Sequence, residues 1–345
     1  FFSKELSKRR DFHVLTTNKR GAGIAVEDQP APQFPFSATY LNFRPDIGWI
    51  YLICRDISRA DCVILNSLFS FFSICVFFTS IVLRKKLIIQ PRGSLSQYGL
   101  KKKFFLKWCL VRLFALFINR FMFIVTSDLE KREVISTFGS NASVDVIPNG
   151  VDISKPPLAP TGTPSNGFKV NSIEKNICFV GRIHQKKRVD ILVNAMSLLQ
   201  QTAEKTWNLH LIGGDDGALK DIKILCDSKL EKNTCTFHGE LRRDCLFSHL
   251  QQMDCLVLVS ENENFGNVIL ESLSVNVPVV VSNNLPWRHL DKLGLGVSCS
   301  LDASEVANSI VSAASLDLKL NNKGLEFVLD NYSWETIVDK FLGLE

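Results

Sequence analysis

Two carboxylates frame the segment of this chain that is best suited to binding or catalysis. Glu263 and Glu271 bound the sequence Glu-Asn-Phe-Gly-Asn-Val-Ile-Leu-Glu. The apolar run Cys255–Val259 before it predicts a strand, and Gly266 marks the expected start of a helix. A helix start presents backbone N–H groups that attract an anion, while carboxylates accept paired hydrogen bonds from vicinal hydroxyls. At the helical rise the two acids would lie roughly 12 Å apart, enough to place one at a sugar and the other at a ribose across a diphosphate. A solvated helix with a chance pair of acids is the plainer alternative.

A second candidate group is basic and lies earlier in the chain. Asn176–Val180 predicts a strand, and the turn after it carries Gly181, Arg182 and Lys187. Gly181 allows a tight turn, so both cations can point at one anion, such as a departing nucleoside diphosphate. A solvated basic loop would have the same composition. The next segment has apolar residues at helical spacing, namely Val189, Leu192, Val193, Met196 and Leu199.

These segments, taken with four others, resemble the family 4 glycosyltransferases. Members of that family are retaining enzymes of the GT-B fold that use nucleotide-sugar donors. The resemblance implies an α/β chain with two doubly wound, Rossmann-like domains facing across a cleft. The segments that carry it are Gln90–Ser94, Val146–Asp152, Phe179–Arg182 with Lys187, Leu211–Gly214, Glu263–Glu271 and Leu285–Trp287.

The same resemblance assigns roles to individual residues. Arg182 and Lys187 would hold the donor diphosphate, and with Glu263 they are the catalytic candidates. Glu263 would hold the transferred sugar together with the backbone of the three residues after it, and Glu271 would hold the ribose. The implied donor-binding set is Gly181, Arg182, Lys187, Glu263, Asn264, Phe265, Gly266 and Glu271.

The implied reaction moves a hexose from a nucleotide diphosphate sugar to an acceptor hydroxyl with retained anomeric configuration. The Pro-Arg-Gly and Pro-Trp sequences are most similar to the branch that builds bacterial surface polysaccharides, so the expected acceptor is a glycan or a lipid-linked sugar. Asn66 and Arg92 are the acceptor-side candidates. No metal or other cofactor is expected, and Asp215–Asp216 is interpreted as a turn. A nucleotide-sugar epimerase of the same fold and a non-catalytic binding protein are the alternatives.

The length of 345 residues favours two domains. We expect an acceptor-side domain over 1–154, a linker rich in proline over 155–173, and a donor-binding domain over 174–330. A closing helix over 331–345 would pack back onto the first domain, as in the family.

Two departures from the family pattern carry expectations of their own. The chain begins with Phe1, and the predicted strand Asp11–Thr16 would match the second strand of the family's first domain. The first strand and its glycine-rich loop would then be lacking, and we expect such a fragment to bind or turn over donor poorly. Arg188 stands where the family usually has glycine, and it could crowd or further charge the phosphate pocket.

Composition and hydropathy limit the remaining partners. The net charge of +5 is modest, and no nucleic-acid partner is expected. The apolar run 68–83 is short for a membrane span and predicts a buried helix. Basic and bulky apolar residues alternate over 100–120, which suits either a helix on an anionic membrane surface or a core helix with a basic end. The ten cysteines include no pair at metal-ligand spacing and favour a reducing compartment. The expected location is the cytoplasm, with peripheral contact at the inner face of the plasma membrane.

Overall fold

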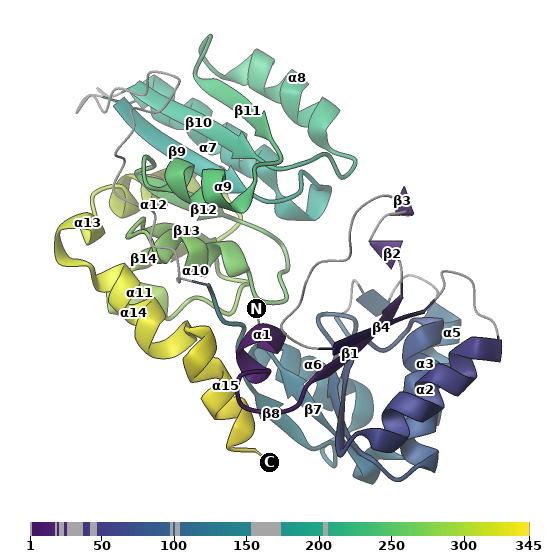
Figure 1. Ribbon diagram of the computed structural model, residues 1–345. Helices are drawn as coiled ribbons and strands as arrows, with labels where there is room; N and C mark the ends of the chain where they lie inside the picture. Colours follow the sequence, from purple (N-terminus) through teal and green to yellow (C-terminus); the bar gives the residue numbers. More distant parts are fainter. Residues whose placement is uncertain are drawn as a thin grey trace. The chain divides into compact units, whose positions relative to one another are not determined.

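The computed structural model describes residues 2–17, 19–20, 24–25, 37–41, 47–96, 99–100, 104–152, 174–202 and 206–344 (Figure 1). The chain divides into two compact units. Unit 1 comprises Phe1–Pro148 and Ile337–Glu345, and unit 2 comprises Asn149–Thr336. The predicted linker 155–173 lies outside the described residues.

Unit 2 is built on one parallel sheet whose order is β11-β10-β9-β12-β13-β14. The strand of this unit that comes first in the sequence, β9, is central. The later strands are added outward from it in both directions. This is the doubly wound order 3-2-1-4-5-6, in which ligands bind at the carboxyl ends of the strands where the order reverses. Here that point lies between β9 and β12. The strands are β9 (Glu174–Val180), β10 (Thr206–Ile212), β11 (Cys235–Gly239), β12 (Cys255–Leu258), β13 (Val279–Ser282) and β14 (Gly296–Cys299).

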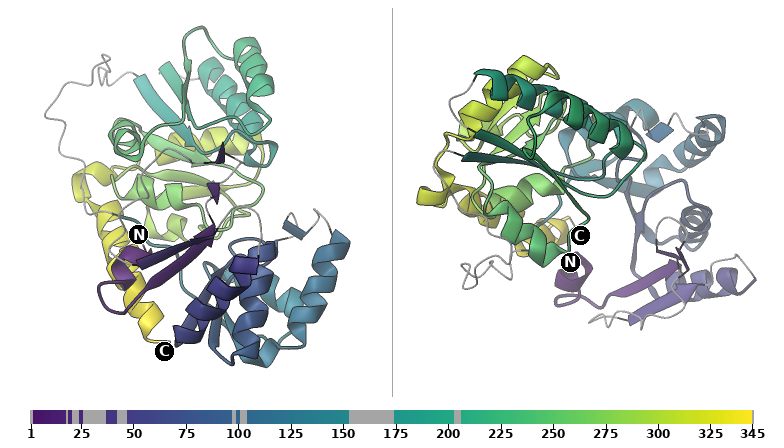
Figure 2. Two further views of the ribbon diagram at one scale, coloured as in Figure 1. Left: turned by 45° about the vertical axis from the view of Figure 1, so that its right-hand side comes forward. Right: turned by 90° about the horizontal axis from the view of Figure 1, so that it is seen from above.

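Helices cover both faces of this sheet (Figures 1 and 2). On one side α7 packs against α8 and α12, and on the other α10 packs against α9 and α14. The apolar positions predicted for α7 are all buried, which confirms the helix and its core-facing side. The bounds are η3 (Gln185–Lys187), α7 (Val189–Thr202), α8 (Leu219–Lys229), α9 (Arg243–Leu250), α10 (Asn267–Leu273), α11 (Leu290–Leu293), α12 (Ala303–Ala313), α13 (Leu318–Asn321) and α14 (Lys323–Tyr332).

The end of α10 is attached to the start of α14. Asn276 has φ 57°, a left-handed conformation that asparagine tolerates better than most residues. Its side chain accepts a hydrogen bond from Leu325 N over 3.0 Å and donates one to Asn322 Oδ1 over 3.0 Å. A Cβ on Gly324 would lie 2.6 Å from Leu273 O, so only glycine permits this approach.

Unit 1 contains a parallel sheet of order β5-β6-β7-β8 and a separate parallel pair, β1-β4. The strands are β1 (His13–Thr17), β2 (Lys19–Arg20), β3 (Ile24–Ala25), β4 (Ser37–Leu41), β5 (Cys62–Asn66), β6 (Lys86–Gln90), β7 (Phe121–Val125) and β8 (Val144–Val146). The helices are α1 (Phe2–Leu6), α2 (Ile47–Arg59), α3 (Phe71–Val82), α5 (Phe104–Ala115), η2 (Ile118–Arg120), α6 (Asp128–Phe138) and, from unit 2 into unit 1, α15 (Trp334–Leu342).

The core of unit 1 is rich in phenylalanine. Phe77 of α3, Phe114 of α5 and Phe123 of β7 are completely buried, and the Phe77 and Phe114 rings lie 4.3 Å apart between centroids. Within the predicted segment 68–83, residues Phe71–Val82 form helix α3, which packs into this core through Val76 and Phe77. Within the described parts of the chain, no helix is both long and apolar enough to cross a membrane.

The two ends of unit 1 pack together. The ring of Phe2 in α1 meets that of Phe341 in α15 edge to face, with centroids 5.2 Å apart. Arg9 forms an ion pair with Asp339. These contacts explain why the last nine residues group with the first unit.

Candidate functional site

The candidate site in unit 2 begins where the sheet order reverses. The loop after β9 carries Gly181, Arg182 and Lys187, and the loop after β12 carries Glu263. A backbone hydrogen bond from Glu261 N to Lys186 O, 2.9 Å long, holds the two loops together. Two residues that lie 76 apart in sequence, Lys187 and Glu263, are thereby brought to the same edge of the sheet.

Lys187 and Glu263 form an ion pair at this edge. Their side chains are only 13% and 12% exposed, so the pair is largely screened from water. Ser260 Oγ also donates a hydrogen bond to Glu263 Oε1 over 2.8 Å. Ser260 is fully buried and was missed by sequence reasoning, although it directly follows the predicted strand before the acids. The carboxylate thus accepts hydrogen bonds from two donors, of which the hydroxyl belongs to a buried residue just after β12.

The turn after β9 is shaped by close backbone contact with the loop after β10. Gly181 N donates to Ile212 O over 2.9 Å, and Ile183 N donates to Gly214 O over 2.8 Å. Gly213 has φ 145°, and a Cβ there would lie 1.9 Å from Gly181 O. That distance is far inside van der Waals contact. The conformation of the basic loop therefore depends on glycine at position 213.

Gly213→Ala is expected to destabilise unit 2 by about 2–4 kcal/mol, because the added methyl group forces the loops after β9 and β10 apart. Thermal unfolding of the purified variant measures the effect. The matched control is Gly217→Ala, since Gly217 has φ 93° but no atom lies within 4 Å of the place that an added methyl group would take. The control separates backbone strain, which both variants share, from the steric clash. Equal melting temperatures for the two variants would contradict the role of the close contact.

Arg182 lies on the exposed side of the same turn. Its Nη1 pairs with Asp216 Oδ2 at 2.8 Å, and its side chain is 67% exposed. The segment Asp215–Asp216 was predicted to form a turn. In the structure Asp215 accepts hydrogen bonds from Gly217 N and Leu219 N just before α8. The interpretation of this segment as a turn did not foresee that Asp216 pairs with Arg182.

Electrostatic effects on Lys186 show how densely charged this loop is. Burial lowers the pKa of Lys186, and the cations Lys187 and Arg182 lower it further, while Glu263 and Asp216 act in the opposite sense. The predicted pair of cations and the predicted acid Glu263 thus share one electrostatic environment. Such a cluster suits a ligand that carries concentrated negative charge.

Arg188 does not enter the cluster in the way that we expected. Its φ is 50°, a left-handed conformation that favours glycine, and it ends the η3 turn. Its guanidinium pairs with Asp190 at 3.0 Å and with Glu261 at 3.3 Å. The positive charge is therefore matched by two acids on its own side, and this arrangement explains how an arginine is accommodated where the family usually has glycine.

The acidic segment continues into α10, which begins at Asn267 after Gly266, as predicted. Only the residues from 267 onward are helical, so the distance estimated for a continuous helix does not apply. Phe265 is buried against the Trp287 ring, with centroids 4.9 Å apart, and Trp287 Nε1 donates to Phe265 O. This contact fixes the backbone between the two acids.

Glu271 lies on α10 and is 18% exposed. Burial raises its pKa, and the nearest cation, Arg243 on α9, opposes that effect from 3.9 Å. A carboxylate in this state gains from any ligand that donates hydrogen bonds to it. The hydroxyls of a ribose would do so.

The acceptor-side candidates lie on unit 1. Asn66 ends β5 and is paired in register with Gln90 of β6. Arg92 follows β6, and its Nη2 donates to Gln90 Oε1 over 2.7 Å. Both residues therefore lie at the carboxyl edge of the same sheet. Buried Glu130 orders the turn that contains Arg92, because its carboxylate accepts hydrogen bonds from Gly93 N over 2.7 Å and from Thr126 N over 2.8 Å.

Comparison with known families gives two matches that together span most of the chain. Residues 2–155 match the family model described as Glycosyltransferase Family 4. Residues 174–316 match the model described as Glycosyl transferases group 1.

Curated relatives are similar at a lower level. An uncharacterized glycosyltransferase of Methanocaldococcus jannaschii is 27% identical over 242 residues, which cover 64% of this chain and 58% of the relative. A D-inositol 3-phosphate glycosyltransferase of Kineococcus radiotolerans is 30% identical over 173 residues, covering 46% and 39% respectively. The chain thus spans about half the length of these relatives.

Solved structures share the fold. Sucrose-phosphate synthase from Thermosynechococcus elongatus superposes with a TM-score of 0.71 at 17% identity, covering 99% of this chain and 90% of that one. Anabaena HepE in complex with UDP-glucose gives 0.68 at 16% identity, covering 96% and 98%. With the two parallel sheets described above, these likenesses confirm the GT-B fold that the sequence predicted.

Proposed function

We propose that this chain, which belongs to the family 4 glycosyltransferases, transfers a hexose from a nucleotide diphosphate sugar to an acceptor hydroxyl. The observation that carries the proposal is the Lys187–Glu263 pair at the reversal point of a doubly wound sheet. In such a sheet this point is the expected ligand site. The residues gathered there are a cation for a diphosphate and a carboxylate for sugar hydroxyls.

The ion pair gives the donor a specific way to bind. A diphosphate between the loops after β9 and β12 would compete with Glu263 for the Lys187 ammonium. Glu263 would then keep its hydrogen bond from Ser260 and could accept hydrogen bonds from the transferred sugar. Arg182, already exposed on the same turn, would supply a second cation. As the bond to the sugar breaks, negative charge grows on the leaving diphosphate, and both cations stabilise it.

The finer parts of the proposal come from the sequence, and the solved structures support one of them, the class of donor. HepE structures contain UDP or UDP-glucose, which favours a nucleotide sugar as the donor here as well. We further propose retained anomeric configuration, no requirement for a metal ion, and a glycan or lipid-linked acceptor used in surface polysaccharide synthesis. The acceptor would lie against Asn66 and Arg92. Nuclear magnetic resonance of the product reports the anomeric configuration directly.

A panel of nucleotide sugars tests the proposal against its alternatives. The chain is incubated with each donor and with simple glycosides as acceptors, and the products are separated by mass and by chromatography. Release of nucleotide diphosphate, with transfer or with hydrolysis, is the expected result. Conversion of a donor into its isomer would instead identify an epimerase. Saturable binding without turnover would identify a binding protein.

Glu271→Gln is expected to weaken donor binding by roughly ten- to a hundredfold, because a charged acceptor of ribose hydrogen bonds becomes a neutral one. Calorimetry with the donor found in the panel measures the change. Because burial raises the pKa of Glu271, its carboxylate is neutralised at a higher pH than an ordinary glutamate, and the difference between wild type and variant should shrink as pH falls. Glu326→Gln, at an exposed position on α14, is the control. Unchanged affinity in Glu271→Gln would remove Glu271 from the site.

We also propose that α5 makes peripheral contact with the inner face of the plasma membrane. Its outer side carries large apolar residues in water, with Phe105 77% exposed and Leu116, just after the helix, 76% exposed. Arg112 lies over the exposed Trp108 ring at 5.2 Å. Apolar side chains beside cations are the composition that binds anionic bilayers. The lysines at 101–103 lie outside the described residues.

The double variant Phe105→Asp, Leu116→Asp is expected to lose most of its binding to vesicles that contain phosphatidylserine. It removes two apolar side chains that would insert into the bilayer and adds two carboxylates that the anionic lipids repel. Cosedimentation at low salt measures the loss. Leu320→Asp is the matched control, since Leu320 on α13 is 84% exposed. If wild type fails to sediment with these vesicles, the membrane proposal is wrong.

A further inference from the structure

Two cysteines of unit 2 lie in direct contact. Cys226 belongs to the last turn of α8, and Cys235 is the first residue of β11, the strand at one edge of the sheet (Figure 1). The Sγ atom of Cys235 donates a hydrogen bond to that of Cys226 over 3.4 Å. A disulfide bond is about 2.05 Å long, so the sulfur atoms need to approach by roughly 1.3 Å to form one. Rotation of the two side chains, with a small shift of the helix end, can close that gap.

The connection between the two cysteines is ordered. Leu230 N donates to Cys226 O over 2.9 Å where α8 ends. In the turn that follows, Thr234 Oγ1 donates to Glu231 O over 2.7 Å. The side chain of Gln200 on α7 accepts a hydrogen bond from Glu231 N and donates one to Thr234 Oγ1. The fold therefore positions both sulfur atoms before any reaction, so closing the bond costs little further conformational entropy.

The contact also favours the thiolate that disulfide formation needs. The hydrogen bond from Cys235 lowers the pKa of Cys226, and burial opposes that effect. The same hydrogen bond raises the pKa of Cys235, so the pair loses a first proton easily and shares the second between its sulfur atoms. Cys226 is only 4% exposed, whereas Cys235 is half-buried. Cys235 is therefore the sulfur that a small molecule in solution can reach.

A second pair of neighbouring cysteines lacks this access. Cys178 of β9 and Cys255 of β12 lie on adjacent strands, and both are completely buried. Burial raises the pKa of both thiols. Thiols that are protonated and enclosed in a core are inert. We expect these two to stay reduced under conditions that oxidise the first pair.

We propose that Cys226 and Cys235 form a modification site, at which a small-molecule disulfide such as oxidised glutathione converts the two thiols into a reversible intrachain disulfide. The Cys235 thiolate attacks one sulfur of the reagent, forms a mixed disulfide and releases one thiolate, which takes up a proton. Cys226 then loses its proton and attacks the Cys235 sulfur, and the second small thiol leaves. Two protein thiols and one small-molecule disulfide thus give one protein disulfide and two small-molecule thiols.

The disulfide would fasten the end of α8 to the start of β11. The opposite ends of both elements lie against the loop after β10. Asp215 of that loop accepts a hydrogen bond from Leu219 N at the start of α8. Gly239 O, at the end of β11, accepts one from Gly213 N over 2.8 Å. Oxidation should therefore stabilise the part of unit 2 that supports the basic turn after β9, whichever reaction unit 2 takes part in.

Peptide mapping of the intact chain detects the disulfide. The chain is equilibrated in mixtures of reduced and oxidised glutathione, its remaining thiols are blocked with N-ethylmaleimide in urea, and it is digested with trypsin. Lys229 and Lys232 separate the two cysteines, so the disulfide appears as one mass that joins peptides 224–229 and 233–242. This linked mass is the expected result, and dithiothreitol should remove it.

A second equilibration in urea measures what the fold contributes. The quantity compared is the squared concentration of reduced glutathione divided by that of oxidised glutathione at half-oxidation. It should be at least about tenfold higher for the folded chain, because the ordered connection holds the sulfur atoms together. The fold and the disulfide then stabilise each other by the same factor. The oxidised chain should accordingly melt about 3 °C or more above the reduced chain.

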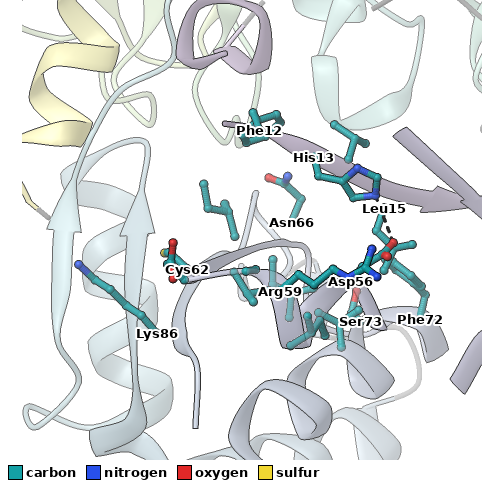
Figure 3. A pocket seen from close by; sticks show the side chains of 18 of the residues that line it. Phe12, His13, Leu15, Asp56, Arg59, Cys62, Asn66, Phe72, Ser73 and Lys86 are labelled. Carbon is teal, nitrogen blue, oxygen red and sulfur yellow. Dashed lines mark hydrogen bonds and ion pairs between the residues drawn. The ribbon is translucent and has the colours of Figure 1, made fainter. Parts of the chain in front are cut away.

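Cys62→Ser is the matched control for Cys235→Ser. Both cysteines are half-buried and are the first residues of their strands, and Cys62 lines an open cavity in unit 1 (Figure 3). Cys235→Ser should give no linked mass and the same melting temperature in both glutathione mixtures. Cys62→Ser should keep the linked mass and the shift in melting temperature. If Cys235→Ser does not fold, the comparison of folded and unfolded wild type still decides the proposal.

Four results would overturn the proposal. The first is absence of the linked mass at the highest proportion of oxidised glutathione. The second is an equal glutathione ratio at half-oxidation for the folded and the unfolded chain. The third is a linked mass in which Cys226 or Cys235 is joined to a different cysteine. The fourth is glutathione retained on Cys235, which would show that Cys226 cannot complete the exchange.

Discussion

Replacing Lys187 by methionine is expected to lower the rate of sugar transfer by about 10²–10³, the usual effect of removing one preorganised charge or donor from the place where negative charge develops. Methionine keeps much of the length of the side chain and removes only the ammonium. The loss should fall mainly on turnover, since charge on the diphosphate is greatest in the transition state. Steady-state kinetics with the donor found in the panel, at saturating acceptor, measures it.

Lys186→Met is the control for charge alone. Lys186 is the neighbouring cation, and its backbone carbonyl, which the substitution leaves intact, forms the contact between the two loops. A change of less than about fivefold is expected there, because Lys187, and not Lys186, forms the ion pair with Glu263 at the proposed diphosphate site. Comparable losses in both variants would show that only the total positive charge of the loop matters. The position of the Lys187 ammonium would then have no special role.

Glu263→Gln is expected to lower turnover by about 10² or more while the affinity for the nucleoside diphosphate product changes by less than about threefold. The product lacks the transferred sugar, so it cannot report contacts made by Glu263 to that sugar. Glutamine keeps an oxygen that can accept the hydrogen bond from Ser260. The variant therefore changes charge with little change in shape.

A stability measurement guards this interpretation. Removing one member of a largely buried ion pair leaves Lys187 without its acid, and this loss can cost about 3–5 kcal/mol where burial is complete. The melting temperature should fall somewhat in Glu263→Gln and rise again in the double variant with Lys187→Met. Glu261→Gln, at a 53% exposed acid two residues away, should retain normal turnover. Normal turnover in Glu263→Gln would reject the proposed role.

Much of unit 2 could be predicted from local sequence, for identifiable reasons. Strands such as Cys255–Leu258 are short apolar runs because both faces of a parallel sheet are covered. The start of α10 after Gly266 and the left-handed Asn276 follow from backbone preferences of single residues. These features depend on nearest neighbours in the chain, which the sequence displays directly.

The contacts across the sheet could not be predicted in the same way. Glu261 N reaches Lys186 O, and Arg182 reaches Asp216, only because β9 lies between β10 and β12 in the sheet. The conformation of Arg188 is also invisible locally, since an arginine gives no sign of a left-handed φ. Its acceptance depends on Asp190 and on Glu261, the latter from a distant loop.

The attachment of α10 to α14 has a consequence for affinity. Helix α10 has seven residues, too few for it to keep its shape by itself in water. The contacts of Asn276 and Gly324 attach the end of α10 to α14. The Glu271 carboxylate is therefore held on a helix that is ordered before any ligand binds. The conformational entropy of that segment is lost when the protein folds, so ligand binding does not have to order it. A loosened attachment should therefore appear as a faster off-rate for nucleotide, although every charge at the site stays in place.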